Sequence, residues 1–104
     1  MRDDLLKIIE HYGVIHQLKK FNEESYELIE AVRDYEEQCA ISEYDLERYV
    51  DKYFIDCIAE ELADCMVLLE QIKVYYNLDN EKIIDEMKHK INRQLKRMEG
   101  EKNE

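Results

Sequence analysis

The sequence contains no proline and only two glycines, Gly13 and Gly100, among its 104 residues. Sheets with tight turns depend on these residue types, so their scarcity favours long helices joined by few turns. Apolar runs of membrane-spanning length are missing, which predicts a protein without a membrane partner. Residues 1–4 are mostly charged and do not open the apolar run of a signal peptide, so we expect a cytoplasmic location.

Cysteine is scarce and irregularly spaced, and this limits the kinds of site that the chain could hold. The three cysteines include no CxxC pair, which argues against a disulfide framework or a zinc site and favours a reducing compartment. The three histidines lack the ExxH spacing of a di-iron bundle: His11, His16 and His89. The remaining candidates for chemistry are carboxylates, amides and basic side chains.

Acidic residues dominate the charge, with a formal net charge of −11. A protein of this sign repels a nucleic-acid backbone, so we expect no nucleic-acid partner. A small phosphorylated ligand remains compatible, because bound metal ions can reverse the local field. The length indicates a single domain with its core at about residues 5–98, and a modest core favours association into a homodimer or homotetramer.

The apolar periodicity predicts four helices, at about residues 2–12, 14–39, 43–76 and 81–98. These lengths and short connections predict an all-α fold, a mainly antiparallel four-helix bundle that is oligomeric. The expected boundaries are an interruption at Gly13, a break at 40–44 with Ser42 and Asp45 as a capping box, a turn at 77–80 capped by Asp79 or Asn80, and a fraying tail at 99–104.

Three apolar stripes are expected to face the core. On the second helix the stripe is Val14, Leu18, Phe21, Leu28, Val32 and Tyr35. On the third helix it is Phe54, Ile58, Leu62, Cys65, Leu69, Ile72 and Tyr76. On the last helix it is Ile84, Met87, Ile91, Leu95 and Met98. The tyrosine-rich stretch at 44–53 is a candidate subunit contact.

Two acidic pairs stand beside these stripes, Glu24 with Glu27 and Glu61 with Asp64. Residues three apart are neighbours on one helix face, so the members of each pair repel each other unless a cation lies between them. The same spacing occurs in Asp34 and Glu37, but that pair has no comparable partner on another helix. Two helices could therefore close four carboxylates into one pocket, a hard-oxygen site for Mg²⁺ or Mn²⁺.

At these residues the chain resembles a known family. Gln17-Leu18, Glu23-Glu24-Ser25-Tyr26-Glu27-Leu28 and Glu61-Leu62-Ala63-Asp64 are similar to the EExxEL and ExxD motifs of the MazG-like, all-α nucleoside triphosphate pyrophosphohydrolases. Lys88-His89-Lys90-Ile91-Asn92-Arg93 resembles the KxxxN stretch on the closing helix of that family. The matches span roughly residues 14–97.

The resemblance implies a function and a set of site residues. It implies Mg²⁺-dependent hydrolysis of an NTP or dNTP to the monophosphate and pyrophosphate, with Mn²⁺ as a substitute metal. The catalytic metal ligands would be Glu24, Glu27, Glu61 and Asp64. Substrate contacts would come from Gln17 near the nucleoside and from Lys88, Asn92 and Arg93 at the phosphates.

Two other functions remain open at this point. Phosphoribosyl-ATP pyrophosphohydrolases have a similar helical fold and similar acidic motifs, so they are a rival within the enzymes. A non-catalytic helical oligomerisation module, with its acids merely solvated, is a rival from another class. The basic residues of the last helix also have a second interpretation, as favourable charge near a helix C-terminus.

Overall fold

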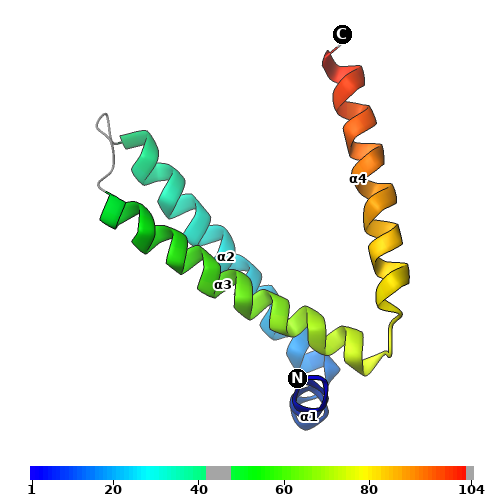
Figure 1. Cartoon of the computed structure of the whole chain (residues 1–104). Helices are drawn as coiled ribbons and strands as arrows, with labels where there is room; N and C mark the ends of the chain where they lie inside the picture. The colour runs from blue at the N-terminus through cyan, green and yellow to red at the C-terminus, as the bar shows by residue number, and fades with distance from the viewer. Residues whose placement is uncertain (42–47, 103–104) are drawn as a thin grey trace.

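The computed structural model describes the backbone of residues 1–41 and 48–102 and the side chains of residues 1–40 and 52–102 (Figure 1). This part of the chain is all-α, as the composition predicted. The four helices are α1 (Arg2–Tyr12), α2 (Val14–Ile41), α3 (Arg48–Tyr75) and α4 (Asn80–Lys102). The expected capping box at Ser42 and Asp45, and most of the tyrosine-rich stretch at 44–53, lie outside the described side chains.

Gly13 separates α1 from α2. Its φ of 91° lies in a region that residues with a Cβ rarely adopt, and its N–H donates to the carbonyl of Ile9 at 2.8 Å. The chain turns there and starts a new helix at the next residue. The interruption expected at this glycine is therefore confirmed.

A short turn at 76–79 joins α3 to α4. Asn77 adopts a φ of 51°, and the side-chain oxygen of Asp79 accepts a hydrogen bond from the N–H of Glu81 at 3.0 Å. The cap predicted at Asp79 is thus confirmed. The prediction of a fraying tail was wrong for residues 99–102, which continue α4, because Glu99, Glu101 and Lys102 are good helix formers and one glycine costs only about 1 kcal/mol.

The core lies where α1 meets the antiparallel pair of α2 and α3. The buried apolar residues among the described side chains are Leu5, Ile9, Cys65 and Leu68. Farther along the pair, the rings of Tyr35 on α2 and Phe54 on α3 lie 6.0 Å apart. No helix in the described part of the chain is long and apolar enough to cross a membrane.

The predicted stripes of α2 and α3 are buried only in part, with Cys65 buried as predicted. Leu18 and Val32 on α2, and Leu62, Leu69 and Tyr76 on or just after α3, are substantially exposed, so their predicted burial was wrong. Gln17, Leu68 and Gln71 are buried instead. The reason is that α1 and α2 cover only one side of α3, the side that also carries the acidic pair, and leave its other apolar side open to solvent.

The last helix, α4, stands apart from the other three (Figure 1). It has no buried residue, and its five stripe residues from Ile84 to Met98 are between 43% and 54% exposed. Their predicted burial within one chain was therefore wrong. The helix itself forms, because helical propensity and the Asp79 cap do not need a partner, but one chain does not close a four-helix bundle.

Candidate active site

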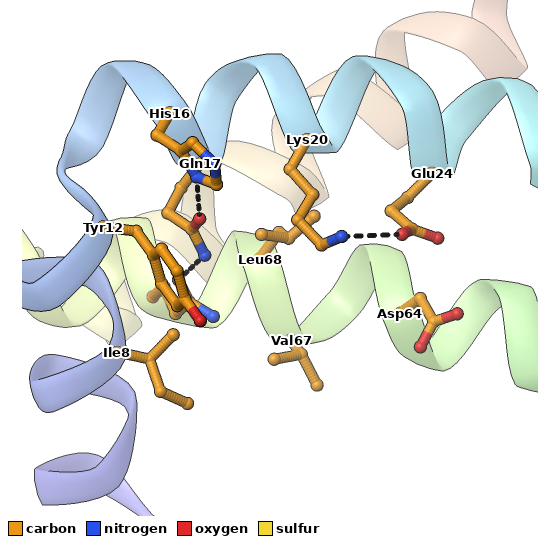
Figure 2. Close-up of a pocket in the computed structure, with 10 residues that line it drawn as sticks. Ile8, Tyr12, His16, Gln17, Lys20, Glu24, Asp64, Val67 and Leu68 are labelled. Atoms are coloured by element: carbon orange, nitrogen blue, oxygen red, sulfur yellow. Dashed lines mark hydrogen bonds and ion pairs between the residues drawn. The ribbon is translucent and has the colours of Figure 1, made fainter.

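Three predicted carboxylates converge between α2 and α3. Glu24 projects from α2, while Glu61 and Asp64 project from α3, and one oxygen from each lies within 4.8 Å of the others. Figure 2 shows Glu24 on α2 and Asp64 on α3 at the same end of the helix pair. Oxygen ligands converging from two helices match the preference of Mg²⁺ and Mn²⁺.

Two of these carboxylates hold oxygens that water cannot reach. Oε2 of Glu24 and Oε2 of Glu61 are buried and have no hydrogen-bond partner among the described residues. Buried polar atoms normally find partners, and leaving one without a partner costs roughly 1–3 kcal/mol. A cation bound between the helices would give both oxygens a partner. The donor set therefore fits a divalent metal ion.

The surroundings of the cluster disfavour the charged form of the Glu24 carboxyl in particular. Burial raises the pKa of the Glu24 carboxyl above its ordinary value of 4.5, and the negative charges of Glu27 and Asp64 raise it further. Lys20, whose Nζ lies 3.7 Å from Oε1 of Glu24, opposes this shift. Lys20 reaches only one oxygen of Glu24, so it does not neutralise the cluster.

Glu27, the fourth predicted ligand, lies at the edge of the cluster. Its charge acts on Glu24, but none of its oxygens joins the three that lie within 4.8 Å. Its side chain is exposed and lines a second pocket of about 330 Å³ together with Glu61 and Asp34. The comparison pair, Asp34 and Glu37, is exposed and contributes no oxygen to the cluster.

Cys65 packs beneath the carboxylates. Burial raises the pKa of its thiol, and the charges of Glu24, Asp64, Glu61 and Glu27 raise it further. Both effects favour the neutral thiol over the thiolate. Its sulfur is not among the three atoms within metal-ligand reach of one another, so Cys65 serves as a packing residue.

A pocket of about 320 Å³ adjoins the carboxylates and runs between α2 and α3 towards α1. Glu24 and Asp64 line one end, and Lys20 follows along α2 (Figure 2). The rest of its wall is formed by Ile8, Tyr12, His16, Gln17, Val67, Leu68 and Gln71. The volume is within the range of small-molecule sites, and the lining is an apolar wall with a few convergent polar groups.

The far end of the pocket is built on a hydrogen-bonded pair of amides. Nε2 of Gln17 donates to Oε1 of Gln71 at 2.8 Å, and Oε1 of Gln17 lies 2.8 Å from Nδ1 of His16. Gln17 is only 4% exposed and Gln71 only 2%. The structure thus places Gln17 in the same pocket as Glu24.

Seven of the ten pocket residues were not predicted as site residues, among them Tyr12, Lys20 and Gln71. Lys20 lies four residues before Glu24, and Gln71 lies seven residues after Asp64, so both share a helix face with a predicted ligand. That spacing was a usable signal. Tyr12 offered none, because its position depends on the chain direction set at Gly13.

The residues predicted to contact phosphate lie elsewhere. Lys88, Asn92 and Arg93 are exposed on α4, and none of them lines the pocket beside the carboxylates. Since α4 stands apart from the α2–α3 pair (Figure 1), a single chain does not bring these three residues to the metal cluster.

Comparisons with known proteins found no relative of this chain. No family model, no curated protein and no solved structure matches this chain.

Proposed function

We propose that the chain is a Mg²⁺-dependent nucleoside triphosphate pyrophosphohydrolase, converting an NTP or dNTP to the monophosphate and pyrophosphate. The observation that carries this proposal is the pair of buried, unpartnered oxygens of Glu24 and Glu61, which meet Asp64 at the mouth of an adjoining pocket. The similarity of the acidic motifs to those of MazG-like enzymes supports the same activity.

Glu24, Glu61 and Asp64 would hold Mg²⁺, with Glu27 near enough to take part. Bound Mg²⁺ supplies charge that offsets the phosphates and lowers the pKa of a bound water, and Mn²⁺ has the same ligand preference. The carboxylates orient the ion between the helices. Without this positive charge, the cluster would repel a triphosphate.

The reaction needs water delivered to the α-phosphorus. The water oxygen forms a bond to that phosphorus, the bond to the α–β bridging oxygen breaks, and pyrophosphate leaves with the electron pair. The proton released by the water passes to a carboxylate of the cluster, which acts as the general base. Lys20, which lines the pocket beside Glu24, would offset negative charge on the substrate.

The proposal includes a second copy of the chain as a partner. Residues Ile84, Met87, Ile91, Leu95 and Met98 form an uncovered stripe on α4, and Ile55, Leu62, Met66, Leu69 and Tyr76 form another along α3. Exposed apolar surface of this extent is typical of an interface. The α4 helix carries seven basic and five acidic residues, whereas the whole chain carries 15 and 26, so α4 complements an acidic partner.

Docking of a partner's α4 onto α3 would complete an antiparallel bundle across two chains. It would also give Lys88, Asn92 and Arg93 a route to the phosphates, which they lack in one chain. We therefore propose a homodimer or a homotetramer as the active form.

The test is to incubate the protein with Mg²⁺ and a panel of ribo- and deoxynucleoside triphosphates, and to measure pyrophosphate and monophosphate together. Equal amounts of the two products, dependent on Mg²⁺, would support the proposal. Turnover of phosphoribosyl-ATP alone would identify the rival enzyme activity. An absence of turnover together with an absence of Mg²⁺ binding would identify a non-catalytic oligomerisation module.

A further inference from the structure

We propose that the end of the pocket formed by Tyr12 and Gln71 binds the nucleobase of the substrate. We further infer that it prefers a base with a carbonyl oxygen over one with an amino group at the same ring position. This inference rests on the proposed function, because it assigns a role to the part of the pocket that the carboxylates do not occupy.

Hydrogen bonds link His16, Gln17 and Gln71 at this end of the pocket. An amide oxygen can only accept, so the 2.8 Å contact between His16 Nδ1 and Gln17 Oε1 requires a proton on that ring nitrogen. Gln17 then uses its Nε2 to donate to Gln71 Oε1. The orientation of the Gln17 amide therefore sets the tautomer of His16 and directs the Gln17 N–H to Gln71.

Gln71, the last residue in this series of hydrogen bonds, has N–H donors that the series does not use. Nε2 of Gln71 carries two N–H bonds, and within the described parts of the chain it makes no hydrogen bond. The side chain is only 2% exposed and lines the pocket. Since Gln71 lines the pocket, a ligand atom that accepts a hydrogen bond can take the place of water at this donor.

The walls around Gln71 suit a flat ring. Tyr12 and His16 stack with ring centroids 5.1 Å apart and an interplanar angle of 16°, and both line the pocket (Figure 2). The side chains of Ile8, Val67 and Leu68 form the apolar remainder of the wall. A heteroaromatic base can lie against these surfaces while its edge meets Gln71.

The length of the pocket fits the rest of a nucleotide. Gln71 lies seven residues after Asp64 on α3, which corresponds to about 10 Å along the helix axis. A base at Gln71 therefore leaves room for the sugar before the phosphates reach Lys20 and the carboxylates. The keto preference follows because a carbonyl oxygen accepts from Gln71 Nε2, whereas an amino group presents a second donor to it.

The test measures nucleoside binding without phosphate or metal, by NMR titration that follows the side-chain amide signals of the glutamines. Uridine is compared with cytidine, and inosine with adenosine, since each pair exchanges a carbonyl oxygen for an amino group. We expect the keto member of each pair to bind at least about tenfold more tightly and to shift the Gln71 amide signals. Equal binding, tighter binding of the amino members, or no binding of any nucleoside would overturn the inference.

Variants connect this preference to the named residues. Gln71→Leu should reduce the keto-to-amino ratio to within about twofold, while Gln38→Leu, the same change at an exposed site, should keep it. If Gln71→Leu does not fold, Tyr12→Leu provides the second test, with Tyr26→Leu as control, because the two tyrosines are 55% and 56% exposed. Tyr12→Leu should weaken the binding of all four nucleosides, and an unchanged affinity would contradict the stacking role.

The two proposals fail in different ways. If pyrophosphate is released but the paired nucleosides bind equally, the base assignment is wrong and the enzyme activity stands. If the keto members bind more tightly through Gln71 but no nucleotide is hydrolysed, the binding site stands and the hydrolase proposal is wrong.

Discussion

Nε2 of Gln17 on α2 donates a hydrogen bond to Oε1 of Gln71 on α3 at 2.8 Å, and both side chains are buried. Gln17 lies seven residues before Glu24, and Gln71 lies seven residues after Asp64. Because α2 and α3 run in opposite directions, both offsets point the same way along the pair. The helix register that joins the two amides therefore also brings the carboxylates together.

The first prediction follows from this register. Gln17→Leu leaves Oε1 of Gln71 without its donor, and Gln71→Leu leaves Nε2 of Gln17 without its acceptor. Each single change should lower the free energy of unfolding by about 1–3 kcal/mol. The double variant should lose less than the sum of the two, because it leaves no unpaired amide in this pair. Urea denaturation of the four proteins measures the coupling, and strict additivity would show that the bond does not hold the register.

The second prediction concerns pH and Glu24. Because the folded state raises the pKa of this carboxyl, Glu24 contributes stability that is present below its ordinary pKa of 4.5 and lost as the pH rises through the raised value. In EDTA, Glu24→Gln should therefore become progressively more stable than the parent from about pH 4 to about pH 7.

Thermal melts across this range measure the difference between variant and parent. The control is Glu23→Gln, which removes the same charge from an exposed neighbouring site and reports the general effect of lowering the net charge. If Glu24→Gln gains no more stability over the parent than Glu23→Gln does, the raised pKa of Glu24 is contradicted. With Mg²⁺ present the order should reverse, because the parent alone keeps the full ligand set.

The third prediction concerns assembly. The uncovered stripes on α3 and α4 predict at least a dimer at micromolar protein concentration, which light scattering measures directly. Ile91→Ser together with Leu95→Ser should shift the protein towards monomer, while His89→Ser, on the opposite face of α4, should not. A mass near 12.7 kDa for the parent at every concentration would show a monomer and contradict the proposed dimer.

The fourth prediction concerns Lys88. If a partner's α4 brings this ammonium to a phosphate, Lys88→Ala should raise KM or lower kcat by one to two orders of magnitude, about 1.4–2.7 kcal/mol. Mg²⁺ affinity without nucleotide should stay the same or rise slightly, because a positive charge has left the site. If Lys88 only favours the helix terminus, kinetics should not change and stability should fall by well under 1 kcal/mol. Steady-state kinetics and a thermal melt separate the two cases.

The sequence predicted the helices, and the shared face of Glu61 and Asp64, because both depend on local spacing. Glu61 and Asp64 are three apart, so any helix places them side by side, and Asp79 caps α4 through its own backbone neighbours. The sequence predicted four converging acids, and Glu24, Glu61 and Asp64 lie together whereas Glu27 does not.

Burial was predicted less well because hydropathy does not say what covers a face. Leu62, Leu69 and Ile91 have the spacing of core residues, yet no other helix of the chain covers them. Gln71 was missed for the opposite reason, since an amide looks like a surface residue until its partner is known. Its hydrogen bond to Gln17 joins residues 54 positions apart, and no local pattern in the sequence predicts that pairing.

The most direct test of the account compares pyrophosphate release in Mg²⁺ by the parent, by Glu61→Gln and by the double variant Asp34→Asn with Glu37→Gln. Glu61→Gln removes one metal ligand and should abolish most turnover while circular dichroism shows an intact fold. The double variant changes a pair with the same spacing outside the cluster, so its rate should stay within a few-fold of the parent. A parent that releases no pyrophosphate from any nucleotide, or a double variant as inactive as Glu61→Gln, would contradict the account.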